Sequence, residues 1–269
     1  MNHELRTKKA FTLIELVVSV GILAMVLSFA SVIFKVSINS HRTAIANAEV
    51  MQKLRAITEQ LNADFRSIAH GYGGYIAFNT DKHDIDGRTI EVNSDCIAFF
   101  ANGDFQSTRQ YDSRTIAGNV ACVFYGPADS NSFGRLPKPK EKIFLRRQTI
   151  LTADAPLQGS DARGEYYKKS LSEWRVTPPF VDPEDWVKRP LIDPNNLKEH
   201  FVMYLAKGVD NFTIQFAERD TLGKIRWMRR KKGEGQNIST NAFKFTFTLY
   251  DSKGIIKKGR TFTHIVYLD

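Results

Sequence analysis

The sequence predicts an α+β fold in which one long N-terminal helix packs on antiparallel β-sheet. Three observations support this class: an apolar run over residues 11–34, a helical stripe of apolar residues after it, and alternation of apolar and polar residues near the C-terminus. The chain has 269 residues. About 200 of them remain for a folded domain beyond the apolar run, which is enough for a sizeable core.

The apolar run is the first element, and it has the length of a membrane span. Phe11 to Phe34 contains a single charged residue, Glu15. At about 1.5 Å per residue, a helix over this run can cross a bilayer. A carboxylate inside such a helix costs at least ~2.5 kcal/mol, so we expect Glu15 to serve a function rather than to be incidental.

The predicted helix continues beyond the apolar run. No glycine or proline occurs from Ser40 to Ala69. Apolar residues recur there at spacings of three and four, which indicates one buried helical face; they are Val50, Leu54, Ile57, Leu61, Phe65 and Ile68. We therefore predict one helix of about 55–60 residues, roughly 85 Å long, from Phe11 to near His70. Two helices with a break near residues 37–39 are the alternative.

Strands follow, because the apolar pattern changes to a period of two. This alternation is typical of antiparallel sheet with one buried face. The predicted strands are Ile97–Ala101, Val120–Tyr125, Lys142–Gln148, Phe212–Phe216, Ile225–Met228, Phe243–Leu249 and Thr261–Leu268. The helical stripe is expected to cover the apolar face of the C-terminal strands.

A proline-rich insertion interrupts the strands over residues of about 153–200. All nine prolines of the chain lie between Pro127 and Pro194, and proline prevents regular strand pairing. Its aromatic residues, including Trp174 and Trp186, either anchor the insertion to the domain or face a partner protein.

The two cysteines, Cys96 and Cys122, lie in separate predicted strands. A disulfide between them is permitted if the domain lies outside the cytoplasm. Two buried thiols explain them as well, so the sequence leaves both alternatives open.

The net charge of +9 is distributed unevenly along the chain. Residues 1–10 carry +2, residues 11–200 carry 0 and residues 201–269 carry +7. Part of the last excess is the cation-rich segment from Arg226 to Lys232, which could attract polyanions. A solvated loop between strands is the favoured interpretation, and we expect no nucleic-acid partner.

No catalytic or metal-binding pattern was found, so we predict neither an enzyme nor a cofactor. The chain lacks Gly-x-Ser-x-Gly, His-Glu-x-x-His and a phosphate-binding glycine loop. We expect His70 and His83 to be separate surface residues. The acidic residues at 81, 84 and 86 fail the EF-hand spacing, because Lys82 occupies a ligand position.

The N-terminus carries a motif that narrows the interpretation. It combines a basic start (Arg6, Lys8, Lys9), a small residue (Ala10) and an apolar segment with an early carboxylate, in the order Lys8-Lys9-Ala10-Phe11-Thr12-Leu13-Ile14-Glu15. This segment resembles the prepilin signal of type IV pilins and of the pseudopilins of type II secretion. The cations place its start on the cytoplasmic side of the membrane.

The resemblance implies processing by a prepilin peptidase, which would cut between Ala10 and Phe11 and methylate the new amine. It implies a leader peptide over residues 1–10, a transmembrane and assembly helix over 11–37, and a periplasmic domain over 38–269. Glu15 would pair with the Phe11 amine of a neighbouring subunit during assembly. The alternative for Glu15 is a carboxylate that reaches back to the membrane interface.

Later segments resemble the J-type minor pseudopilins, by order and spacing. The segments are Leu61–Arg66, Asp95–Phe99, Val123–Tyr125, Leu145–Arg147, Val209–Phe216, Trp227 and Phe245–Asp251. This resemblance implies a pseudopilin fold and a structural subunit at or near the tip of the type II secretion pseudopilus. Its partners would be the I-type and K-type minor pseudopilins and the major pseudopilin, at the inner membrane.

Two other functions remain open. One is a minor pilin of a type IV pilus, with contact to DNA or a surface. The other is a single-pass, membrane-anchored binding protein whose N-terminus only mimics the signal.

Overall fold

The computed structural model of the chain describes residues 12–69, 74–85, 87–156, 159–160, 165–168, 187–192, 203–219, 223–231, 235–237 and 240–268. It divides into two compact units, Met1–Ile45 and Ala46–Asp269. The boundary between the units falls inside the first helix.

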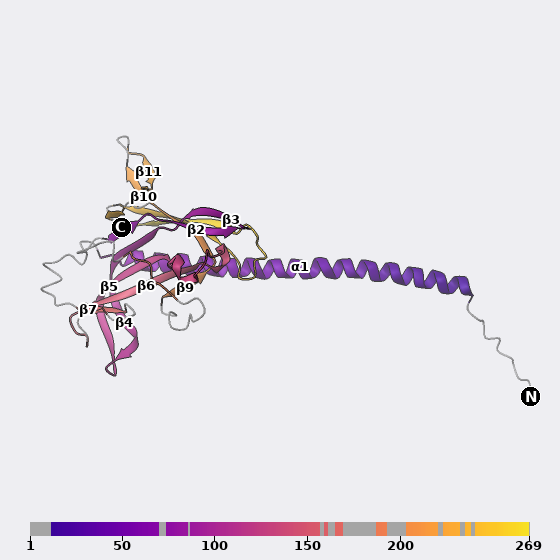
Figure 1. The fold of residues 1–269 in the computed structure, drawn as a ribbon, viewed down its shortest axis with the longest axis horizontal. Coiled ribbons are helices and arrows are strands. Elements are labelled where there is room, and N and C mark those ends of the chain that lie inside the picture. Colours follow the sequence, from indigo (N-terminus) through magenta and orange to yellow (C-terminus); the bar gives the residue numbers. More distant parts are fainter. Residues whose placement is uncertain are drawn as a thin grey trace, which may run out of the picture. The chain divides into compact units, whose positions relative to one another are not determined.

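Helix α1 runs without interruption over Leu13–Arg66, 54 residues (Figure 1). Its sequence contains no proline and one glycine, Gly21, so nothing in it forces a kink. This confirms the prediction of one long helix, and the alternative break near residues 37–39 does not occur. The observed ends lie a few residues inside the predicted ones.

The remaining elements are strands and two short 3₁₀ helices. They are β1 (Gly74–Ala77), β2 (Thr80–Ile85), β3 (Arg88–Asn93), β4 (Cys96–Tyr111), β5 (Arg114–Pro127), η1 (Ser130–Phe133), η2 (Pro139–Glu141), β6 (Ile143–Thr152), β7 (Gly159–Ser160), β8 (Tyr166–Lys168), β9 (Tyr204–Lys207), β10 (Val209–Arg219), β11 (Ile225–Met228), β12 (Gly235–Asn237), β13 (Ala242–Leu249) and β14 (Arg260–Tyr267). Every strand predicted from the sequence is present.

The larger sheet has eight strands in the order β12-β1-β4-β5-β6-β8-β7, and β9 also pairs with β6. Its centre is the long β4–β5 hairpin, in which Tyr111 pairs with Arg114. The two turn residues, Asp112 and Ser113, both have positive φ, as a two-residue turn that follows the strand twist requires. All pairings in this sheet are antiparallel except β6 with β8.

The second sheet has four antiparallel strands in the order β11-β10-β13-β14. Along β13, Phe243, Phe245 and Phe247 are buried while Lys244 and Thr246 between them are half-buried. The predicted alternation of the C-terminal strands is therefore confirmed. A separate hairpin, β2–β3, pairs from Thr80 with Asn93 to Ile85 with Arg88.

The main core forms where the C-terminal part of α1 packs between the two sheets. Val50, Ile57, Leu61 and Phe65 of the predicted stripe are buried in it, and Leu54 and Ile68 are partly buried. The Phe65 ring lies 4.3 Å from the ring of Phe99 in β4 and 5.4 Å from that of Phe243 in β13. The stripe thus covers the C-terminal strands, as predicted, and the larger sheet as well.

A second core lies on the other face of the larger sheet. Alternate residues of β4 belong to it, among them Ala98 and Phe100, while Ile97 and Phe99 face the main core. Val187 and Ile192 of the proline-rich insertion are buried in this second core. The described part of the insertion is therefore anchored to the domain, whereas Trp174 and Trp186 lie outside the described residues.

Candidate functional site

Helix α1 begins at a reciprocal hydrogen-bonded cap formed by Thr12 and Glu15. The Thr12 backbone N–H and hydroxyl each donate to Glu15 Oε2 at 3.0 Å. The Glu15 backbone N–H donates in turn to Thr12 Oγ1 at 3.3 Å. This is the capping box that the sequence Thr-x-x-Glu favours. The cap fixes the rotamer of Glu15 and places the start of α1 next to the predicted cleavage point.

The cap uses only one oxygen of Glu15. Within the described residues, Glu15 Oε1 has no hydrogen-bond partner, and the side chain is exposed. One carboxylate oxygen is thus available to a cation from another chain. The other predicted site residues, Arg6, Lys8, Lys9, Ala10 and Phe11, lie outside the described residues.

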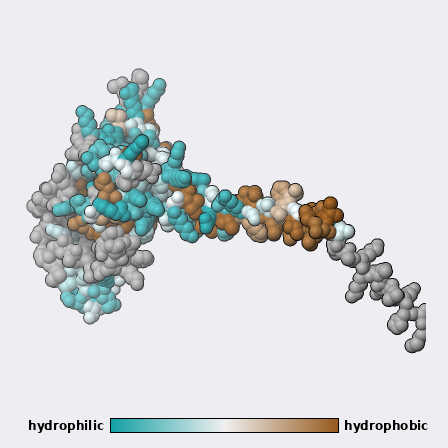
Figure 2. All heavy atoms as spheres, turned by 45° about the vertical axis from the view of Figure 1, so that its right-hand side comes forward, coloured by the Kyte–Doolittle hydropathy of each residue, from teal (hydrophilic) through white to brown (hydrophobic). Residues whose placement is uncertain are grey.

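The helix after Glu15 exposes its apolar side chains on all sides. Leu16, Ile22, Phe29 and Phe34 each expose 59–68% of their surface, and Figure 2 shows this segment as a continuous hydrophobic surface. By length and composition, the helix is able to cross a membrane. The apolar surface continues past the apolar run of residues 11–34, because Val36, Ile38 and Ile45 are also exposed.

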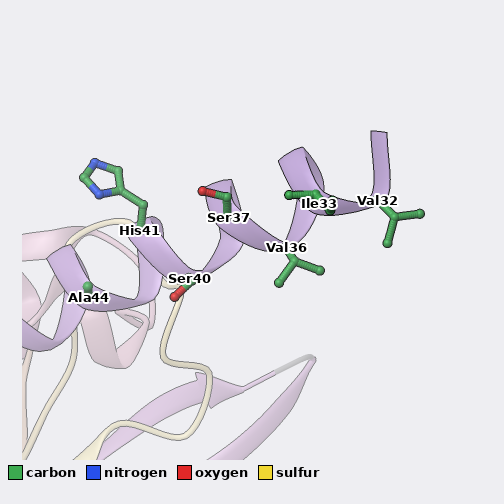
Figure 3. A pocket seen from close by; sticks show the side chains of 7 residues that line it. All are labelled: Val32, Ile33, Val36, Ser37, Ser40, His41 and Ala44. Atoms are coloured by element: carbon green, nitrogen blue, oxygen red, sulfur yellow. The ribbon is translucent and has the colours of Figure 1, made fainter. Parts of the chain in front are cut away.

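A shallow groove lies on the helix beyond the apolar run (Figure 3). Small and apolar side chains line it together with one histidine: Val32, Ile33, Val36, Ser37, Ser40, His41 and Ala44. Within the described residues, no hydrogen bond joins the His41 ring to Ser37 or Ser40. The chemistry of the groove suits close packing of another helix.

Several buried ion pairs lie in the described part of the unit Ala46–Asp269, and three of them involve residues that the sequence pattern did not mark as buried. Arg146 of β6 donates two hydrogen bonds to the carboxylate of Asp64 on α1, with Nε–Oδ2 at 2.6 Å and Nη2–Oδ1 at 2.7 Å. The Tyr125 hydroxyl donates to the same carboxylate. Burial and the nearby Asp64 raise the pKa of Tyr125 well above its usual value, so the phenol keeps its proton and remains a donor.

The second pair corrects the prediction for His83. This residue is buried, not on the surface, and its Nδ1 lies 3.1 Å from Asp210 Oδ2. Lys142 Nζ lies 2.7 Å from Asp210 Oδ1. Burial opposes ionisation of Asp210, but His83 and Lys142 outweigh it and lower its pKa. The group joins the hairpin β2–β3 to the start of β6 and to β10.

The third pair changes the interpretation of the cation-rich segment Arg226–Lys232. Arg229 is not a solvated surface residue, because its guanidinium donates two hydrogen bonds to the buried carboxylate of Asp95. The Nη2–Oδ1 distance is 2.7 Å and the Nε–Oδ2 distance is 2.9 Å. Its guanidinium also lies over the ring of Phe78, 5.7 Å from the centroid. Arg229 therefore holds the edge of the second sheet to the start of β4.

The two cysteines are buried free thiols. In the register of the β4–β5 hairpin, Cys122 faces Phe100. Cys96 lies four residues away along β4, about 13 Å at the strand rise, and a disulfide needs Cα atoms closer than about 7 Å. Of the two alternatives that the sequence left open, the structure therefore supports two buried thiols and not a disulfide. Burial raises the pKa of each thiol to about 12.

The described ranges contain no group of three or more His, Cys, Asp or Glu side chains placed to hold a metal ion. Asp81, which the sequence analysis considered for calcium, pairs with Arg189 at 2.6 Å. Asp86 and His70 lie outside the described residues.

One comparison with known proteins gave a result. Residues 5–31 match the family model described as the prokaryotic N-terminal methylation motif. Searches of curated proteins and of solved structures gave no match. The matched segment contains residues 5–10 of the predicted leader, the Thr12–Glu15 cap and most of the exposed apolar run.

Pilin-like proteins of this kind are structural, and they are processed by a prepilin peptidase and assemble with other pilin-like subunits. One apolar N-terminal helix behind such a motif suits an anchor in the inner membrane. The methylation motif, followed by a long helix and an antiparallel β-rich domain, indicates a type IV pilin-like protein.

Proposed function

We propose that the chain is a minor pseudopilin, a structural subunit at or near the tip of the type II secretion pseudopilus that helps to initiate its assembly. One observation carries this proposal: a prepilin-type signal leads directly into a helix whose apolar side chains are exposed on all sides. Such a surface is stable in a membrane or against other helices, and both environments occur during assembly of a filament.

The choice of a minor pseudopilin rests on the J-type resemblance. The segments that carry it now lie on α1, β4, β5, β6, β10, β11 and β13. They include both partners of one buried ion pair, Asp64 with Arg146, and one partner of another, Asp95, whose Arg229 follows Trp227 by two residues. The segments that carry the resemblance therefore contain residues that connect α1 and the two sheets.

We further propose how the chain is divided. The prepilin peptidase removes residues 1–10 and methylates Phe11. Residues 11–37 cross the inner membrane, and residues 38–269 lie in the periplasm. The expected partners are the I-type and K-type minor pseudopilins and the major pseudopilin.

Glu15 has a defined part in this proposal. Thr12 engages Oε2 and leaves Oε1 available. After cleavage the Phe11 amine is a cation at the membrane level, and an unpaired charge there carries a desolvation cost of several kcal/mol. Pairing of Glu15 with the amine of a neighbouring subunit removes this cost for both groups in one register of the two helices.

The test is Glu15→Val in the full chain, with Ser28→Val as the matched control on the same helix. Within the described residues, the Ser28 hydroxyl donates to the Ala24 carbonyl of its own helix and to no other group. We expect both variants to be processed and inserted in the inner membrane. Only Glu15→Val should fail to co-purify with the other minor pseudopilins and should lower protein export to background.

Two outcomes would contradict the proposal. If Glu15→Val assembles and supports export as the native chain does, Glu15 has no pairing role. If the native chain co-purifies with subunits of a type IV pilus instead, the chain is a minor pilin.

A further inference from the structure

The connection between β13 and β14 forms a rigid loop. Asp251 is fully buried, and its two carboxylate oxygens accept the backbone N–H groups of Ile255 at 2.9 Å and Ile256 at 2.8 Å. Ile256 packs against the main core. These contacts hold the backbone of the loop in the observed conformation.

The loop rests on helix α1. The Ser252 backbone N–H donates to Glu49 Oε1 at 2.9 Å. Lys53 Nζ donates to the Tyr250 carbonyl at 2.9 Å and pairs with Glu49 at 2.7 Å. Figure 1 shows this yellow connection beside α1, where the helix enters the unit Ala46–Asp269.

The loop presents cations to solvent. Lys253, Lys257 and Lys258 are exposed, and we call these three residues the basic loop. No ion pair joins any of them to another described residue. Lys140 of η2 lies against Gly254 and adds a further cation. The two acids beside the loop, Asp251 and Glu49, are already engaged as described above.

The covalent structure limits how far this loop can lie from the membrane. Its anchor, Glu49, follows Phe34 by 15 residues of α1. At the helical rise these residues span at most about 22 Å, however the two units are oriented. The headgroup layer extends roughly 5–7 Å beyond the hydrocarbon core, and charges act over a Debye length of about 8 Å. Together they cover about 15 Å, and tilt of the helix and the length of the lysine side chains cover the remainder.

We propose that the basic loop binds the anionic phospholipid headgroups of the membrane that α1 crosses. The inference rests on the membrane anchor of the proposed function. A tethered loop meets the bilayer at a high and permanent local concentration, and clustered lysines next to a membrane helix are attracted to anionic lipid. This contact would set the height and tilt of the β-rich unit above the membrane before the subunit is extracted.

The test is a lysine footprint of the full chain in lipid nanodiscs. One set of discs contains phosphatidylcholine alone, and the other also contains phosphatidylglycerol. Acetylation of each lysine is followed by mass spectrometry, with the exposed Lys82 and Lys224 on other elements as internal controls. We expect the three basic-loop lysines to react about threefold more slowly on anionic discs, with the difference lost at high salt.

A further arm separates lipid from free phosphate: glycerol phosphate added to phosphatidylcholine discs should give no protection. Equal rates on both kinds of disc would overturn the proposal. So would protection that appears only when other minor pseudopilins are added, since this would assign the loop to an acidic protein partner. Co-elution of the chain with the discs reports the anchor separately, so failure of the loop contact and failure of the anchor are distinguishable.

Discussion

Asp64 shows how a single residue joins the helix to the sheet. Its carboxylate accepts two bonds from Arg146 and one from Tyr125. Removing one partner of a buried, bonded pair leaves the other charge without compensation, at a cost of about 3–5 kcal/mol. The orientation of α1 against β5 and β6 therefore depends on this contact as well as on the apolar stripe.

Leu61 tests the stripe at the residue scale. It is fully buried in the main core, so Leu61→Asp places an unpaired charge there. We expect a loss of about 3–5 kcal/mol in the free energy of unfolding of the soluble domain. Met51 on the same helix exposes 51% of its surface, and Met51→Asp should change stability by less than about 0.5 kcal/mol. Equal melting temperatures for the two variants would mean that the stripe is not buried in solution.

Asp251 gives a prediction with a pH signature. Burial alone would raise its pKa, but the backbone N–H donors, including those of Ile255 and Ile256, outweigh burial and lower it. A carboxyl whose pKa is lower in the folded than in the unfolded chain stabilises the fold above about pH 4, and this contribution is lost as pH falls through the folded-state pKa.

Asp251→Asn should therefore cost about 1 kcal/mol at pH 7, because the amide nitrogen cannot accept a hydrogen bond. The difference from the native domain should shrink below about pH 4. Urea unfolding of both proteins across this range measures it. A difference that is independent of pH would show that the carboxylate charge does not contribute.

At the scale of elements, local patterns were sufficient for the helix and the strands. The spacing from Val50 to Ile68 predicted the buried face of α1, and the alternation of Phe243, Phe245 and Phe247 predicted β13. Both patterns are contained in short segments, and the burial that they predict is observed. The sequence also placed the Thr12–Glu15 segment correctly as the start of a helix, without identifying the cap.

The buried polar contacts could not be predicted in the same way. Asp64 lies off the predicted apolar stripe, and its partner Arg146 lies 82 residues away in the sequence, so no local pattern reveals the pair. Arg229 and His83 were assigned to the surface for the same reason, as Asp95 and Asp210 come from other strands. Such pairs arise from sheet topology, which no local period reveals. The strand order of the larger sheet was not predicted either.

The division of α1 between two units gives a prediction for its segments. The unit Ala46–Asp269 contains the cores and the buried ion pairs. A chain of residues 38–269 should therefore be soluble without detergent and should unfold in one cooperative transition. Broad, non-cooperative melting of this chain would show that the apolar segment is needed for folding as well as for anchoring.

At the scale of the whole molecule, the two parts of the chain have different requirements. Residues 13–45 expose apolar side chains that need a membrane or other helices, whereas the β-rich unit satisfies its own core. The prepilin-type motif explains this combination, because the same helix would serve first as an anchor and then as a packing surface. The proposed pairing of Glu15 depends on removal of the leader, since only cleavage creates the Phe11 amine.

The most direct test is therefore the mass of the N-terminal peptide of the protein extracted from membranes of cells with an active prepilin peptidase. We expect a chain that begins with N-methylated Phe11. Ala10→Leu is the matched control, because a bulky residue before the cut should block processing and leave Met1. A native protein that retains Met1 under the same conditions would contradict the assignment as a pilin-like subunit and would favour a single-pass, membrane-anchored protein.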